Sequence, residues 1–71
     1  MYRVFIPKSV EEIEDNAFKN CENLKEVAFE EGSALKIIGK CAFSGCKRLA
    51  EMTFPEGLEK INSFAFYETG L

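Results

Sequence analysis

Several residue types and patterns that mark common classes of protein function are missing from this 71-residue chain. It has no histidine, and its nine basic residues are outnumbered by twelve acidic ones, which gives a net charge of −3. The first absence removes the side chain most often used in acid–base catalysis, and the second removes the basic surface that binds nucleic acid. We therefore expect no nucleic-acid partner.

Long hydrophobic runs are also lacking. No apolar stretch approaches the ~20 residues that cross a bilayer, so we expect no membrane insertion. Residues 1–8 lack the apolar segment of a secretory signal. The sequence thus predicts a cytoplasmic protein if the chain is complete. If the chain is a fragment of a longer parent, an extracellular or cell-surface location is expected instead.

The hydrophobic residues that are present suffice for one small folded domain over residues 1–71. They make up 46% of the chain and include seven phenylalanines, which can drive collapse. A chain this short buries only about 60% of its unfolded surface. A sizeable enzyme pocket is therefore not expected.

An internal repeat organises the whole chain. The pair Ala-Phe occurs at residues 17–18, 42–43 and 65–66, and alignment on these pairs defines three units, 4–26, 27–51 and 52–71. Apolar residues then recur in shared columns. These columns are Val4, Val27 and Met52; Ile6, Phe29 and Phe54; Val10, Leu35 and Leu58; Ile13, Ile38 and Ile61; and Leu24, Leu49 and Leu71.

Each unit has the same internal order of elements. An alternating segment such as Val27-Ala28-Phe29 predicts a short strand with one buried face, and a second short extended piece follows a turn. Residues 15–21 are expected to form one short helical turn, opened by Asp15. A unit of about 23 residues cannot bury its own apolar edge, so it must stack on a copy of itself. The fold class expected is an α/β solenoid, a right-handed coil with parallel strands and three repeats.

Charged residues support this register independently. Neighbouring coils of a parallel stack lie about 4.8 Å apart, so residues in one column become cross-strand neighbours. The expected pairs of opposite sign are Arg3–Glu26, Glu11–Lys36, Lys36–Glu59, Asp15–Lys40 and Glu22–Lys47. The exception is Glu26 beside Glu51, which places like charges together.

The combined pattern resembles a known family. Ile-Pro-x-Ser-Val-x-x-Ile-x-x-x-Ala-Phe-x-x-Cys-x-x-Leu, from Ile6 to Leu24, is similar to the BspA-like leucine-rich repeat, and the later units repeat it. The resemblance implies a curved parallel solenoid that acts in adhesion and protein recognition, often on a cell surface. It implies no catalytic residues and no cofactor.

Two features depart from that family. The chain has three units where members usually have many, and it has no evident caps. Exposed ends of a solenoid invite edge-to-edge association. We expect either a homo-oligomer that covers these ends or a fragment of a longer protein.

The three cysteines do not predict a metal site. Without histidine they fall short of four tetrahedral ligands. Cys21 and Cys46 share one column and are expected to be buried as small hydrophobes, whereas the environment of Cys41 is left open. An odd count favours reduced thiols and no disulfide framework.

Candidate partner-binding residues are those that point outward from the first strand of each unit, together with the longer acidic turn of the middle unit. They are Arg3, Phe5, Glu26, Ala28, Glu30, Glu31, Glu51 and Thr53. Phe5 departs most from the pattern. It fits a binding surface and a contact between subunits equally well.

Three functions follow in order of preference. The first is a non-catalytic module that binds a protein partner, as part of a surface recognition protein. The alternative is a small self-contained intracellular inhibitor or regulator whose acidic surface binds a basic site on its partner. An enzyme ranks third, because nothing in the sequence places two carboxylates across a cleft.

Overall fold

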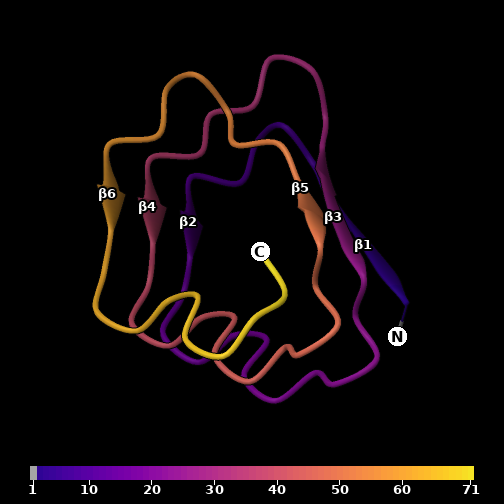
Figure 1. Cartoon of the computed structure of the whole chain (residues 1–71). Helices are drawn as coiled ribbons and strands as arrows, with labels where there is room; N and C mark the ends of the chain where they lie inside the picture. The colour runs from indigo at the N-terminus through magenta and orange to yellow at the C-terminus, as the bar shows by residue number, and fades with distance from the viewer. Residues whose placement is uncertain (1) are drawn as a thin grey trace.

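Two short parallel sheets form the framework, and each sequence unit supplies one strand to each sheet. The computed structural model describes residues 2–71. The first sheet has the order β1 (Arg3–Ile6), β3 (Glu26–Phe29) and β5 (Glu51–Met52). The second has the order β2 (Glu12–Ile13), β4 (Ile37–Ile38) and β6 (Lys60–Ile61). Figure 1 shows the two sheets on opposite sides of a common interior, joined by successive windings of the chain. We call residues 4–26, 27–51 and 52–71 the first, second and third coils.

The register expected from the apolar columns is confirmed. Val4 lies opposite Val27, and Val27 lies opposite Met52. In the second sheet, Ile38 pairs with the isoleucine of its column on either side. Since a shift of one residue would turn these side chains outward, the apolar columns fix the pairing.

A phenylalanine ladder runs through the core. Phe43 stacks on Phe18 with ring centroids 5.2 Å apart, and on Phe66 at 5.4 Å, with interplanar angles of 8° and 7°. Phe43 is fully buried, and so are Leu24, Leu35, Ile38 and Leu49. Most of the fully buried side chains belong to the second coil, which within residues 2–71 is the coil with a neighbour on both sides.

The prediction of a helical turn over residues 15–21 is wrong. Residues 15–21 form a series of turns, and no helix occurs anywhere in residues 2–71, so no helix there could cross a membrane. Asn16 and Asn20 both have φ of +62°, the left-handed region, which interrupts a right-handed helix after each few residues. The Phe18 N–H instead donates to Ala42 O of the next coil at 2.7 Å. Backbone N–H groups that would bond within a helical turn thus donate to the neighbouring coil instead.

Two of the expected ion pairs form. Arg3 Nε lies 3.0 Å from Glu26 Oε1, and Lys36 Nζ lies 3.8 Å from Glu59 Oε2. In the part of the chain that the structure describes, the Glu11–Lys36, Asp15–Lys40 and Glu22–Lys47 pairs do not reach ion-pair distance. Asp15 Oδ1 accepts a hydrogen bond from the Lys40 backbone N–H at 2.8 Å, so its carboxylate joins the coils in another way.

Candidate functional site: a groove between the second and third coils

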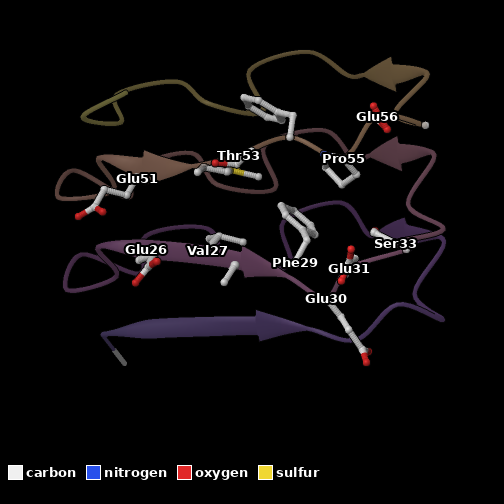
Figure 2. Close-up of a pocket in the computed structure, with 15 residues that line it drawn as sticks. Glu26, Val27, Phe29, Glu30, Glu31, Ser33, Glu51, Thr53, Pro55 and Glu56 are labelled. Atoms are coloured by element: carbon white, nitrogen blue, oxygen red, sulfur yellow. The ribbon is translucent and has the colours of Figure 1, made fainter.

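A groove of about 510 Å³ lies between the second and third coils, at the end of the first sheet. Residues 26–33 form one wall and residues 51–57 form the other. Figure 2 shows these two stretches of chain one above the other, with side chains from both directed around the intervening space. The groove is thus formed by β3 and β5 together with the backbone that follows them.

A proline explains why the coils separate there. Between the first and second coils, the Glu30 N–H donates to Ile6 O at 3.0 Å. The aligned residue of the third coil is Pro55, which has no N–H to donate to Phe29 O. Over residues 2–71, no backbone hydrogen bond joins residues 28–33 to residues 53–57.

An insertion falls in the same turn as the missing bond. Compared with the first unit, the second contains two extra residues, Glu31 and Gly32, and Gly32 has φ of +80°. A residue without a side chain adopts this backbone at little cost. Pairing between the second and third coils resumes where the Glu59 N–H donates to Lys36 O at 2.9 Å.

The charges that line the groove are all negative. They come from five of the chain's twelve acidic residues, and neither lysine nor arginine lines it. These residues are Glu26, Glu30, Glu31, Glu51 and Glu56. Glu26 and Glu51 lie directly opposite in the sheet register, an arrangement that is destabilising for like charges.

The five carboxylates differ in whether they already have an ion-pair or hydrogen-bond partner within the chain. Glu26 pairs with Arg3, and Glu30 Oε1 accepts the Lys8 backbone N–H at 2.8 Å. Figure 2 shows Glu30 directed toward the first coil, away from the groove, whereas Glu31 extends toward the third coil. The carboxylates of Glu31, Glu51 and Glu56 make no ion pair within residues 2–71.

Apolar side chains complete the lining. Phe29 is half-buried and lies between the two coils, close to Pro55 (Figure 2). Phe54 is 42% exposed and meets the edge of the Phe66 ring, with centroids 5.5 Å apart. The groove therefore offers apolar contact area beside unpaired negative charge.

Six of the eight residues proposed from the sequence as partner-binding line this groove. They are Glu26, Ala28, Glu30, Glu31, Glu51 and Thr53. Arg3 and Phe5 lie outside it on β1, where Phe5 is 56% exposed and pairs in register with Ala28. A role for any of the eight in binding stays a prediction.

Sequence reasoning missed the groove itself and, apart from Thr53, the lining residues of the third coil. The apolar columns predict core positions for Met52 and Phe54, and the sequence predicts a turn at Pro55 and no role for Glu56. Two signals could have revealed them. Pro55 is aligned with a residue whose N–H is needed, and the extra pair of residues falls in the same turn of the preceding unit.

The three thiols lie elsewhere, and all are free. Cys46 is fully buried and its Sγ donates to Phe18 O at 3.1 Å, as expected for a core thiol, while Cys21 and Cys41 are partly buried. Burial raises the pKa of the Cys46 thiol above its ordinary value. The adjacent Cys21 thiol adds to this rise in pKa by charge repulsion, although a backbone hydrogen bond from Cys21 opposes it. Cys46 is therefore a protonated core residue at neutral pH.

No cluster suited to a metal ion was found in the described part of the chain, where no three histidine, cysteine or acidic side chains converge. The groove carboxylates are spread along two walls. Their arrangement fits an extended ligand better than a compact ion.

Comparison with known proteins identifies the repeat. The family model described as "BspA type Leucine rich repeat region (6 copies)" matches residues 1–71. That description counts six copies, so the match does not confirm the three repeats expected from the sequence. No protein of curated function matches the chain significantly.

A solved structure supports the same assignment. It is a leucine-rich cell surface protein from Faecalibacterium prausnitzii, 37% identical, with a TM-score of 0.87. The similarity covers 96% of this chain and 18% of that protein, so the chain spans about a fifth of its length. The parallel coils, their columns and both comparisons agree: the chain belongs to the BspA-type leucine-rich repeat family.

Proposed function

We propose that this chain is a non-catalytic protein-interaction module of three leucine-rich repeats that binds its partner in the groove between the second and third coils. The observation that carries the proposal is that an open groove with unpaired carboxylates and exposed aromatic surface interrupts an otherwise regular stack. Pockets with apolar walls and a few polar groups are common ligand sites in proteins.

A cell-surface location for this chain, as a fragment of a surface recognition protein, is part of this proposal. The support is the similarity to a leucine-rich cell surface protein, of which this chain covers a small share. The acidic groove also suits the alternative, a small regulator that binds a basic site on its partner. Both functions need the same groove, so one experiment tests the binding surface for either.

Selection from a library of displayed random peptides on the immobilised chain tests the groove. Thr53 is exposed and lines the groove, so Thr53→Trp should block it. Asn23→Trp is the control, because Asn23 is exposed and lies outside it. We expect enriched peptides that bind the wild type and Asn23→Trp but lose about tenfold or more in affinity for Thr53→Trp. Enriched peptides that bind both variants equally well would place binding elsewhere and overturn the proposal.

A further inference from the structure

We infer that the groove binds an extended, positively charged segment of a protein partner, with arginine or lysine side chains lying between the two coils. This inference rests on the proposed function and names the chemistry of the partner. It starts from the sign of the charges, because every charged residue in the lining is acidic.

The sheet register makes this negative charge costly in the unbound protein. Glu26 and Glu51 are direct neighbours across β3 and β5, and only Glu26 has a cationic partner, Arg3. Lys36 lies beside Gly57 of the third-coil wall, but its ammonium pairs with Glu59, outside the lining. A cation that entered the groove would relieve this repulsion, which is electrostatic complementarity toward a basic ligand.

The shape of the groove favours a long side chain over a small ion. Phe29 and Pro55 supply apolar surface between the coils, and Glu31 lines the same groove beside Phe29. Arginine and lysine carry an aliphatic stem that packs on such surface while the charged end reaches a carboxylate. Arginine can also stack on an aromatic face.

Unpaired backbone groups of the groove favour a partner segment in an extended conformation. Because Pro55 has no N–H, the Phe29 carbonyl finds no donor in residues 2–71 to match the Glu30 N–H that bonds Ile6 O. The two walls continue the parallel strands β3 and β5 in the same direction, beyond the point where their pairing ends. An extended peptide can supply hydrogen bonds to backbone groups left in this way, as in strand addition to a sheet.

Binding of a synthetic peptide of alternating arginine and serine, labelled for fluorescence anisotropy, tests the inference. The comparison peptide carries citrulline in place of arginine, which keeps the shape and removes the charge. We expect the arginine peptide to bind at least about tenfold more tightly than the citrulline peptide at low salt, and to weaken as salt is added.

Two double variants with the same change in net charge separate groove binding from general attraction. Glu31→Gln with Glu56→Gln removes two groove carboxylates, whereas Glu14→Gln with Glu22→Gln removes two exposed carboxylates elsewhere. The groove variant should lose about five- to tenfold in affinity for the arginine peptide, and the control about twofold at most. Equal losses in the two variants, equal binding of the citrulline peptide, or no binding of the arginine peptide would each overturn the inference.

The peptide selection distinguishes failure of this inference from failure of the proposed function. Groove-dependent peptides without basic residues would leave the groove as a binding site and refute its preference for positive charge. An absence of groove-dependent peptides would refute both.

Discussion

A single aromatic side chain in the middle coil connects the whole core. Phe43 stacks on one ring from each neighbouring coil and has no exposed surface. Its partners Phe18 and Phe66 each stack on one ring of the ladder and are only half-buried. Phe43 is therefore expected to contribute more to the free energy of unfolding than either outer ring of the ladder.

Truncation of this ring should remove most of the stability of the domain. We expect Phe43→Ala to lower the free energy of unfolding by about 3–5 kcal/mol, because it loses buried area and leaves a cavity. Marginal small domains have little more than that in total. Thermal or urea unfolding followed by circular dichroism measures the loss.

Phe5→Ala is the matched control, since it truncates the same side chain at a site that is 56% exposed. Its cost should stay below about 1 kcal/mol. Equal destabilisation by the two variants would contradict the assignment of Phe43 as the centre of the core.

Residue columns were the most predictable part of this protein. A residue such as Val27 must recur at the same place in each unit, because every coil presents the same buried face to its neighbour. Side-chain ion pairs were less predictable. Asp15 shows why: its carboxylate satisfies a backbone donor of the next coil, a competing partner that a column alignment does not include.

At the scale of an element, the turn segment is where sequence reasoning failed. Asp15 is a good first residue for a helix, but a single turn has no cooperative stability of its own. The structure uses left-handed residues in every coil, and Cys41 and Phe64 occupy the position of Asn16 with φ of +58° and +59°. Asparagine tolerates this region far better than most residues. Cysteine and phenylalanine gave no signal of it.

Replacement of Cys41 by asparagine should therefore stabilise the turn of the central coil. We expect Cys41→Asn to raise the free energy of unfolding by about 0.5–1 kcal/mol, because it relieves backbone strain. Cys41→Val should lower it, since a β-branched side chain is least compatible with positive φ. Urea unfolding of both variants measures the difference, and a more stable valine variant would refute the backbone argument.

The groove was equally hidden at this scale, for a different reason. Pro55 is compatible with a turn in any single unit, as Pro7 is in the first. The effect of a proline on the stack depends on whether a preceding coil lies beside it with a carbonyl to be bonded. Within residues 2–71 no coil precedes Pro7, whereas Pro55 follows the second coil and leaves Phe29 O without a backbone donor. A proline therefore opens a groove only where an N–H at its position would have bonded a preceding coil.

At the scale of the whole molecule, the exposed large hydrophobic side chains of residues 2–71 are confined to the two outer coils. The large hydrophobic residues that remain exposed in residues 2–71 are Tyr2, Phe5, Phe54, Ile61, Phe64, Tyr67 and Leu71. None belongs to the second coil. Ile61 is 49% exposed although Ile38, in the same column, is fully buried, so the difference comes from the missing neighbour and not from the residue.

A second copy of the chain could supply that neighbour by continuing the columns. The same register would place Arg3 of a second copy beside Glu51, and Glu12 of a second copy beside Lys60, both of opposite sign. Glu59 would meet Glu11, which opposes the contact. Because the two ends are different surfaces, such a contact is head-to-tail and extends without closing.

We therefore expect the 71-residue chain to associate reversibly through its ends, with a weight-average sedimentation coefficient that rises with concentration. Ile61→Lys places a charge on the open face of β6 and should weaken association at least about tenfold, because a buried isoleucine contributes about 1.5–3 kcal/mol. Ala50→Lys adds the same charge at an exposed site of the second coil, between the two ends, and should leave association unchanged. If wild-type protein stays monomeric to about millimolar concentration, or if both variants weaken association equally, the ends are not the contact. The exposed aromatic residues of the outer coils would then be open surface in the isolated chain.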